Sequence, residues 1–264
     1  MKGAEKLVQL AKSGVKKFGW IPDRPDARDR KFSFSTPPVA IPLPSLVDWS
    51  EQCGTAYDQL SLGSCVANSV CELMRFNAFS QGNKECDPSR LFLYYVARDL
   101  AYTSALDCGS TIRDAIKGVA KIGVCSEQDW PYDVLKFAKK PQKSAYSSAE
   151  KFQAIAYERV GPSLEDMKLC LATGRPFSFG FTVYDSFLDK SWHPSGMMPT
   201  PSLSEADHGG HAVLAVGYSD EKQCFLIRNS WGSDWGLAGN FWMPYSVISN
   251  ENLCDDRWTI FSVE

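Results

Sequence analysis

Apolar residues follow two different periods along the chain, one in each half. Between residues 46 and 160 they recur at three- and four-residue spacing, as on one face of an α-helix. The segments that this spacing predicts to be helical are 64–82, 88–100 and 111–122. After residue 176, apolar residues alternate with small or polar ones or run together, which is typical of strands. The segments predicted to be strands are 176–183, 211–218 and 224–228. A helical half followed by a β-rich half predicts an α+β protein with two lobes.

The N-terminal residues have a different character. Apolar residues between 4 and 18 have near-helical spacing with lysines opposite, which predicts a short amphipathic helix packed on the body. Pro22 and Pro25 keep the next segment extended or turned, and residues 33–45 are rich in Ser and Pro, as linkers are. The chain is therefore predicted to have three parts: an N-terminal arm and linker over 1–44, a helical lobe over 45–160 and a β-rich lobe over 161–264.

Composition places the chain among ordinary globular proteins. Its 264 residues are 44% hydrophobic and 22% charged, enough for a sizeable core. No run approaches the roughly 18 apolar residues of a membrane span. The first twenty residues lack the apolar core of a secretory signal. We therefore expect either a protein that stays in the cytoplasm or is packaged in a particle or vesicle, or a chain from which a signal has been left out.

Charge is distributed unevenly between the arm and the rest of the chain. Residues 1–31 carry nine Lys and Arg against four Asp and Glu, a net charge of +5, whereas the remainder has a net charge of −8. A basic arm and an acidic body predict that the arm docks on its own body, with a solvated tail as the alternative. The acidic body and the lack of a basic-aromatic patch argue against nucleic-acid binding.

Cysteine and histidine patterns give no metal site. There are nine cysteines, so at least one thiol stays free if the others pair, and no C-x-x-C occurs. The missing signal favours reduced thiols. Of the three histidines, His208 lies three residues before His211, and we interpret it as a loop residue near a cleft rather than as a ligand. Neither a metal nor a cofactor is expected.

Cys65 is the strongest candidate for a nucleophile. Gly63 permits a sharp turn, Ser64 is a favourable N-cap, and Cys65 occupies the first position of the predicted helix. A thiol there feels the positive end of the helix dipole, which stabilises the thiolate. Gln59 lies six residues upstream and could turn its amide towards the same point. Alone, the segment could equally hold a small buried cysteine.

Two later segments change that interpretation. His211 begins an apolar strand, and Asn229 opens the segment Asn-Ser-Trp-Gly-Ser-Asp-Trp-Gly after another strand. Taken singly, they could be a satisfied strand-end histidine and a turn capped by tryptophan. Taken with Cys65 and Gln59, they supply a nucleophile, a base, a partner for the base and an oxyanion donor.

These motifs resemble those of papain-family cysteine peptidases, which include the cathepsins. A Gln six residues before Gly-Ser-Cys, a His-Ala-Val-Leu-Ala-Val-Gly-Tyr strand and the Asn-Ser-Trp-Gly block carry the resemblance, over residues 46–240 or so. His211 follows Cys65 by 146 residues, within the roughly 130–150 typical of the family. The resemblance implies a helical left lobe with the cysteine, a β-barrel right lobe with the histidine and asparagine, and a cleft between them.

The resemblance also implies roles for single residues. Cys65 would be the nucleophile, His211 its base and acid in a resting thiolate–imidazolium pair, Asn229 the partner of the imidazole, and Gln59 an oxyanion donor. The residues implied to bind substrate are Gly63, Ser64, Gly109, Ser110, Gly210 and Trp231.

The chain departs from the family pattern in three places. Leu62 stands where the family usually has a disulfide-forming cysteine, and Val66 where it has tryptophan. Gly109-Ser110 stands where the family has a substrate-binding Gly-Gly pair. No insertion with paired histidines follows Cys108, and this favours an endopeptidase over a carboxydipeptidase.

The arm resembles the short propeptide of compact microbial or viral members. We expect residues 1–44 to occupy or flank the cleft of a monomeric zymogen, with cleavage within residues 32–45, and peptides or proteins to be the substrates. A non-catalytic peptide-binding protein on the same fold and a thiol acyltransferase or peptide ligase are the alternatives.

Overall fold

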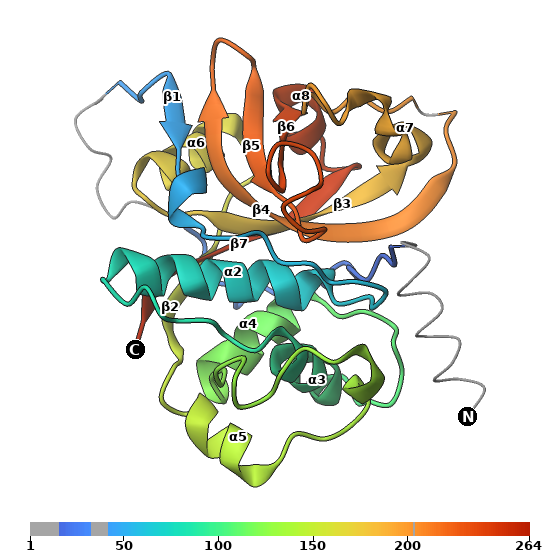
Figure 1. Ribbon diagram of the computed structural model, residues 1–264. Coiled ribbons are helices and arrows are strands. Elements are labelled where there is room, and N and C mark those ends of the chain that lie inside the picture. The colour runs from blue at the N-terminus through green and yellow to red at the C-terminus, as the bar shows by residue number, and fades with distance from the viewer. Residues whose placement is uncertain (1–15, 33–41, 203) are drawn as a thin grey trace.

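A computed structural model describes residues 16–32, 42–202 and 204–264. Most of the helix predicted over residues 4–18 lies outside the described residues. The body has two layers, with helices α2, α3, α4 and α5 on one side and an antiparallel sheet on the other (Figure 1). The α+β arrangement that the two periods predicted is present.

The helical layer is built around α2 (Cys65–Ser80), which lies between the sheet and the helices α3 (Arg90–Leu100), α4 (Ile112–Lys121) and α5 (Lys143–Ala149) (Figure 1). Because α2 is covered on both sides, most of its residues are buried, including polar ones such as Asn68 and Glu72. The three helices predicted from periodicity are present, each a little shorter than predicted.

Side-chain caps fix the starts of two of these helices. The Ser89 hydroxyl accepts from the Phe92 amide at the start of α3, and Thr111 accepts from the Asp114 amide at the start of α4. Ser64 precedes α2 but does not cap it. The expected cap is wrong because the Ser64 hydroxyl bonds to Tyr132 Oη at 2.6 Å and accepts from Asn68 Nδ2 instead.

The sheet has the strand order β2-β7-β3-β4-β5-β6, with β1 paired to β4. Its strands are β1 (Leu46–Asp48), β2 (Ala154–Arg159), β3 (Phe177–Tyr184), β4 (Asp207–Ser219), β5 (Cys224–Arg228), β6 (Asn240–Pro244) and β7 (Cys254–Val263). The edge strands β2 and β6 do not pair with each other, so the expected β-barrel is wrong in one respect: among the described residues, the sheet is open.

Short elements complete the chain. They are the single-turn helices η1 (Ser50–Gln52), η2 (Val134–Lys136), α7 (Asp185–Leu188), η3 (Lys190–Trp192) and α8 (Tyr245–Ile248), and the helix α6 (Leu164–Ala172). An aromatic core fills the sheet's other face, and Phe177, Phe179 and Phe181 of β3 are all buried within it. The strand is buried on both faces because α2 covers the opposite side.

Strand pairing connects the two halves of the sequence. Strand β2, near the end of the segment expected to form the helical lobe, pairs with β7 at the C-terminal end, and β1 pairs with β4. Because strands from both predicted lobes belong to one sheet, their pairing does not mark a boundary at residue 160. The division of the chain there stays a prediction. In the described part of the chain, no helix has the length and apolar character needed to cross a membrane.

Candidate active site

Cys65 lies at the first position of α2, where the helix meets the sheet. The loop before it is held by Asp107, whose Oδ1 accepts from the Gly63 amide at 3.0 Å and from the Tyr94 hydroxyl at 2.5 Å. The thiol itself is fully buried. Backbone N–H groups of Ala212, the residue after His211, and of Gly19 lie against it. The fold thus brings the thiol next to β4.

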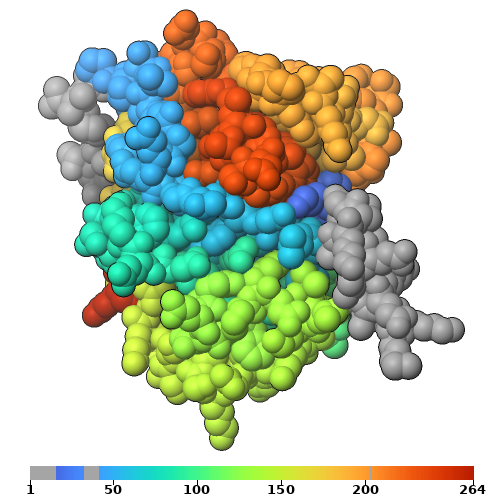
Figure 2. Space-filling view, in the orientation of Figure 1, coloured from blue at the N-terminus to red at the C-terminus, as the bar shows by residue number. Residues whose placement is uncertain are grey.

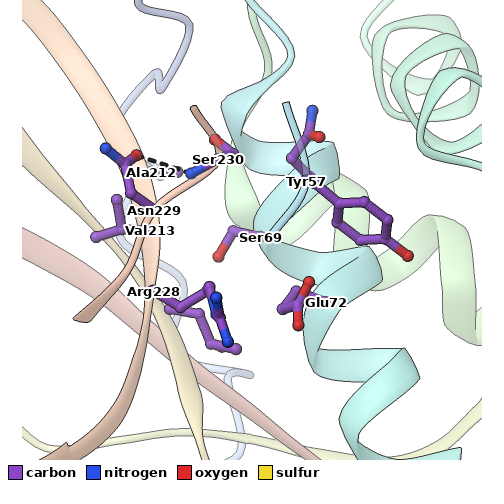
Figure 3. A pocket seen from close by; sticks show the side chains of 10 residues that line it. Tyr57, Ser69, Glu72, Ala212, Val213, Arg228, Asn229 and Ser230 are labelled. Atoms are coloured by element: carbon purple, nitrogen blue, oxygen red, sulfur yellow. Dashed lines mark hydrogen bonds between the residues drawn. The ribbon is translucent and has the colours of Figure 1, made fainter. Parts of the chain in front are cut away.

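His211 and Asn229 form a hydrogen-bonded pair on the sheet. The His211 Nε2 atom lies 2.8 Å from Asn229 Oδ1. This oxygen also accepts from the Ser230 amide at 2.8 Å, as the dashed line in Figure 3 shows. Asn229 Oδ1 can only accept hydrogen bonds, as it does from the Ser230 amide. His211 must therefore be the donor in its bond to the same oxygen, which assigns the proton to Nε2. The other ring nitrogen, Nδ1, is buried and has no hydrogen-bond partner in the described part of the chain. It is left as the basic nitrogen.

Trp231 covers this pair. Its ring stacks on the His211 imidazole with centroids 5.1 Å apart and an interplanar angle of 28°. The ring thereby shields the hydrogen bond between His211 and Asn229 from water, which strengthens it.

Burial sets the protonation of the thiol and the imidazole. It raises the pKa of Cys65 to about 11, although the surrounding backbone N–H groups lower it. It also lowers the pKa of His211 to about 4, against the opposing effect of the Asn229 hydrogen bond. Both shifts favour the neutral thiol and the neutral imidazole, because burial disfavours a charged thiolate or imidazolium. The thiolate–imidazolium resting pair stays a prediction.

Gln59 is oriented at both ends of its amide. Its Oε1 accepts from the Ser230 hydroxyl at 2.8 Å. Its Nε2 donates to the carbonyl oxygens of Leu62 and Lys17, both at 2.9 Å. Lys17 belongs to the N-terminal segment, so this segment reaches the residue implied to be the oxyanion donor.

The same segment runs through the seam between the two layers. In Figure 2 its dark blue atoms enter between the cyan helical residues and the orange sheet residues. The Trp20 amide donates to the Gly210 carbonyl at 2.9 Å, and the Ser110 amide donates to the Gly19 carbonyl at 2.9 Å. The Ile21 amide donates to the Ser110 carbonyl at 3.1 Å.

Most of the predicted substrate-binding residues meet this segment. A Cβ added to Gly19 would lie 1.9 Å from the Gly63 carbonyl oxygen, and one added to Gly109, whose φ is +82°, would lie 2.1 Å from the Gly19 oxygen. The ring of Phe18 lies 6.2 Å from that of Trp231. Ser64 is the exception, because its hydroxyl faces away towards Tyr132.

Behind the site, a cavity of about 10 Å³ lies between α2 and the sheet. Its volume is about that needed by one water molecule. Ser69 and Glu72 of α2 face Arg228 and Asn229 across it (Figure 3). Burial raises the pKa of Glu72, and the neighbouring Arg75, 2.5 Å away, opposes this shift. This polar seam belongs to the interface between the layers.

Several residues that hold the site were not predicted. Tyr94, Asp107 and Ser230 position the groups around the thiol. Tyr94 lies at helical spacing in the segment predicted over 88–100, and Ser230 follows Asn229 directly, but neither pattern indicates a contact with the site; Asp107 has no signal in the sequence. His208 was expected in a loop, but it lies at the start of β4, 2.6 Å from Asp185. The described residues contain no group of three potential metal ligands.

A cysteine at the start of a central helix, next to a histidine and asparagine carried by a sheet, defines a papain-like protein. The chain belongs to the papain family of cysteine proteases, whose model matches residues 43–257. It is 37% identical over 93% of its length to an uncharacterized peptidase C1-like protein of Acanthamoeba polyphaga mimivirus, of which it covers 87%.

Solved structures agree with this assignment. Xylellain, a cysteine protease from Xylella fastidiosa, is 40% identical and superposes with a TM-score of 0.88, over 94% of this chain and 96% of that one. The procathepsin B S9 of Trypanosoma congolense shares the fold at 19% identity, with a TM-score of 0.75 over 94% and 86% of the two chains. Among sequence relatives, procathepsin L of Felis catus is 27% identical over 80% of this chain, which spans 63% of that protein.

Proposed function

We propose that the protein is a cysteine endopeptidase that hydrolyses peptide bonds through a thioester on Cys65. We further propose that residues 1–44 keep it inactive until they are cut and leave. Membership of the family supports the first part, since every position of the Cys–His–Asn set and the Gln is filled. The short loop at Cys108, which carries no histidine to hold a substrate carboxylate, supports internal cleavage.

The proposed reaction uses groups already near one another. Once the arm leaves and water enters, His211 Nδ1 takes the proton of the Cys65 thiol, and the thiolate attacks the substrate carbonyl. Gln59 Nε2 and the Cys65 amide donate to the oxyanion. The imidazolium then gives its proton to the leaving amine. Water, activated by the same nitrogen, hydrolyses the thioester and restores the thiol.

The hydrogen bond from Gln59 Nε2 to the Lys17 carbonyl carries the proposal of inhibition. In the proposed reaction, the donor of this bond is the group that stabilises the oxyanion, so the Lys17 carbonyl takes the position that a substrate carbonyl needs. Phe18 and Gly19 cover the imidazole and the thiol at the same time. A substrate therefore cannot reach the thiol until the arm has moved.

The test compares three forms of the full chain carrying a site for a sequence-specific protease within residues 33–41. The first is intact. The second, called the nicked chain below, is cut there after folding and separated from the arm fragment by gel filtration in high salt. The third is the nicked chain with Cys65→Ala. Each is assayed on a panel of fluorogenic peptides at mildly acidic and neutral pH.

We expect the nicked chain to cleave, the intact chain to be slow and the Cys65→Ala chain to be inactive. An intact chain as fast as the nicked one would overturn the inhibitory role. Cleavage by the Cys65→Ala chain would overturn the nucleophile. Products formed only with an added amine acceptor, and none with water, would show a ligase instead of a peptidase.

A further inference from the structure

A cavity of about 340 Å³ lies between the arm and helix α4, and none of the candidate active-site residues lines it. Positive charge predominates on its walls. Five of the lining side chains are cations, namely Arg28 and Arg30 of the arm and Arg113, Lys117 and Lys121 of α4. The carboxylates among the lining residues are Asp26 and Asp29, both of the arm. In a chain with a net charge of −3, this cavity holds a local excess of positive charge.

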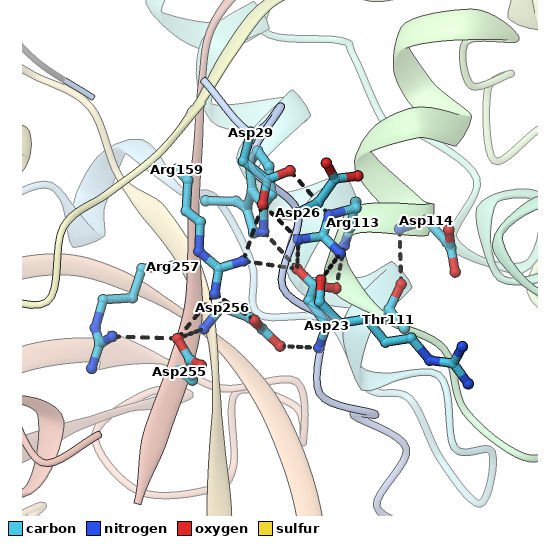
Figure 4. Close-up of polar contacts among 12 residues, drawn as sticks. Asp23, Asp26, Asp29, Thr111, Arg113, Asp114, Arg159, Asp255, Asp256 and Arg257 are labelled. Carbon is cyan, nitrogen blue, oxygen red and sulfur yellow. Dashed lines mark hydrogen bonds and ion pairs between the residues drawn. The ribbon is translucent and has the colours of Figure 1, made fainter. Parts of the chain in front are cut away.

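Both carboxylates of the cavity already have a cationic partner. Asp26 pairs with Arg28, with Nε–Oδ1 at 2.9 Å and Nη2–Oδ2 at 2.6 Å. Asp29 pairs with Arg113 across the boundary between arm and body, with Nε–Oδ1 at 3.1 Å and Nη2–Oδ2 at 2.5 Å (Figure 4). Each pair is bidentate and uses both oxygens of its carboxylate. Neither carboxylate is therefore left over to neutralise the other cations of the cavity.

The remaining three cations are Arg30, Lys117 and Lys121. In the part of the chain that the structure describes, their side chains form no hydrogen bond or ion pair. Outside that part, the sequence has a single carboxylate side chain, that of Glu5. The chain therefore cannot supply a carboxylate for each of the three cations, and their charges are available to an added anion.

Helix α4 presents its cations in a row. Lys117 and Lys121 follow Arg113 at intervals of four residues, which places the three side chains on one face of the helix. Like charges at this spacing repel one another. The one acid of α4, Asp114, does not line the cavity. The arm relieves the repulsion only at Arg113, through Asp29, whereas an anion bound in the cavity would relieve it along the whole row.

Arg30 brings a cation to the opposite wall. Its carbonyl accepts from the Arg159 amide at 2.7 Å, and the Phe32 amide donates to the Arg159 carbonyl at 2.8 Å. These two hydrogen bonds fix the backbone of the arm beside β2. Arg30 therefore faces the row on α4 only while this part of the arm is docked.

We infer that this cavity binds a small phosphate-type anion with at least two negative charges, which Arg30 holds from the arm and Lys117 and Lys121 hold from α4. Lys and Arg side chains commonly bind phosphate groups. The cavity volume of about 340 Å³ is far larger than the roughly 10–15 Å³ that one water molecule needs, so it admits more than a monatomic ion.

Binding of this anion would also hold the arm in place. One of the three cations belongs to the arm and two belong to the body, so the anion binds the docked state more tightly than the released state. By linkage, it stabilises the docked state. The binding itself does not depend on peptidase activity, whereas its effect on inhibition rests on the proposed role of the arm.

The first experiment measures anion binding by isothermal titration calorimetry at constant ionic strength. The protein is the intact chain with Cys65→Ala, which keeps the arm attached and uncut, and the probes are pyrophosphate and orthophosphate. Two further chains add Lys121→Met or, as the control for the loss of charge, Lys143→Met. Lys121 ends α4 and Lys143 begins α5, and both residues are exposed, but Lys143 does not line the cavity.

We expect pyrophosphate to bind at one site per chain, about tenfold more tightly than orthophosphate. Lys121→Met should weaken this binding about tenfold, as for the loss of one charge-assisted hydrogen bond, and Lys143→Met should leave it unchanged. No measurable binding of pyrophosphate, equal binding of the two anions, or equal losses in the two variants would overturn the inference.

The second experiment tests whether the anion joins the arm to the body. Fluorescence anisotropy gives the dissociation constant of a dye-labelled peptide of residues 16–31 for the nicked chain with Cys65→Ala, with and without saturating pyrophosphate. The wild-type peptide is compared with an Arg30→Met peptide. An Arg24→Met peptide is the control, because Arg24 is exposed and does not line the cavity.

We expect pyrophosphate to tighten the binding of the wild-type and Arg24→Met peptides about tenfold, as for one charge-assisted hydrogen bond gained, and to leave the Arg30→Met peptide unchanged. The same response of all three peptides, or a response of none, would overturn the role of the anion in holding the arm. A failed peptidase is recognised separately, because both experiments use a chain without the Cys65 thiol and measure binding alone.

Discussion

At the scale of single residues, the site depends on groups that hold other groups in place. Gln59 is held by Ser230 at one end of its amide, Cys65 by the loop that Asp107 secures, and His211 by Asn229 under Trp231. Ser230, Asn229 and Trp231 are buried and Asp107 is half-buried, so water competes little for these hydrogen bonds. The resulting rigidity keeps donors and acceptors aimed at one point.

Ser230→Ala tests this support directly. Without the hydroxyl, Gln59 Oε1 loses its partner and the amide can rotate, so its Nε2 donor is no longer held on the proposed oxyanion. We expect kcat of the nicked chain to fall about tenfold, less than the loss of an entire oxyanion donor, with KM nearly unchanged. Alkylation of Cys65 by iodoacetamide should keep its rate, because the thiol is untouched.

Ser249→Ala serves as the control, since its hydroxyl bonds to the Tyr245 carbonyl in α8, in a different part of the sheet layer. An unchanged kcat in Ser230→Ala, or an equal fall in both variants, would contradict the orienting role.

At the scale of elements, helix α2 and strand β4 bring together what lies far apart in the chain. Periodicity predicts both elements because α2 carries a helical apolar pattern and β4 a continuous apolar run. It places neither beside the other. The arm adds a third element at this junction, and its close approach requires glycine at Gly19 in the arm and at Gly109 in the body.

Gly19→Ala therefore should loosen the arm. The added Cβ would lie 1.9 Å from the Gly63 carbonyl oxygen, a backbone atom that cannot turn aside. In the intact chain, we expect iodoacetamide to alkylate Cys65 at least about tenfold faster, which corresponds to a loss of about 1.4 kcal/mol in arm docking. Mass spectrometry of the labelled peptide gives the rate.

Ala27→Ser enlarges an exposed residue of the same segment and should leave the rate unchanged. If Gly19→Ala were alkylated no faster than Ala27→Ser, the arm would not be what covers the thiol.

At the scale of the whole molecule, two titrating groups buried by the arm act in opposite directions. Burial and then the charge of Asp256 raise the pKa of Asp23 from 3.8 to about 6, so the docked arm takes up a proton as the pH falls and docking strengthens. Burial lowers the pKa of His211 from 6.5 to about 4, so the released state takes up a proton and docking weakens. The response of the wild-type chain is the difference of the two.

Asp23→Asn removes the first effect and leaves the second. Between pH 7 and pH 5, the dissociation constant of a peptide of residues 16–31 for the nicked chain should therefore rise about tenfold more with the Asp23→Asn peptide than with the wild-type peptide. Isothermal titration calorimetry at the two pH values measures this difference.

A peptide with Asp26→Asn is the control, because Asp26 pairs with Arg28 inside the arm, and it should follow the wild-type peptide. Equal pH responses of the Asp23→Asn and wild-type peptides would show that Asp23 docks already ionised.

Much of this protein could be predicted from residue types and spacing alone. The helices beginning near Ser64, Pro88 and Thr111 and the strands through Phe179, Val213 and Leu226 follow from local periodicity, which depends only on neighbours in the chain. The candidate site residues could be predicted from short motifs. In each motif, the candidate nucleophile or base stands within a few residues of a turn-forming residue or an apolar strand, so the motif is recognisable without the fold. Two predictions were wrong: that the sheet closes into a barrel, and that the Ser64 hydroxyl caps α2. Both features depend on partners that are distant in the chain.

The sequence by itself determined the helical and strand segments, the papain-like fold class and the candidate set Cys65, His211, Asn229 and Gln59, because these depend on local pattern and on motifs within a few residues. Only the tertiary structure decided that the thiol and the imidazole are buried, which disfavours their charged forms, that Asp107 and Ser230 hold the site, and that Asp23 and Asp29 reach Arg113 and Arg159. Burial and ion pairing are properties of the folded surroundings. They arise between residues as far apart as Asp23 and Trp258, where no local pattern records the contact.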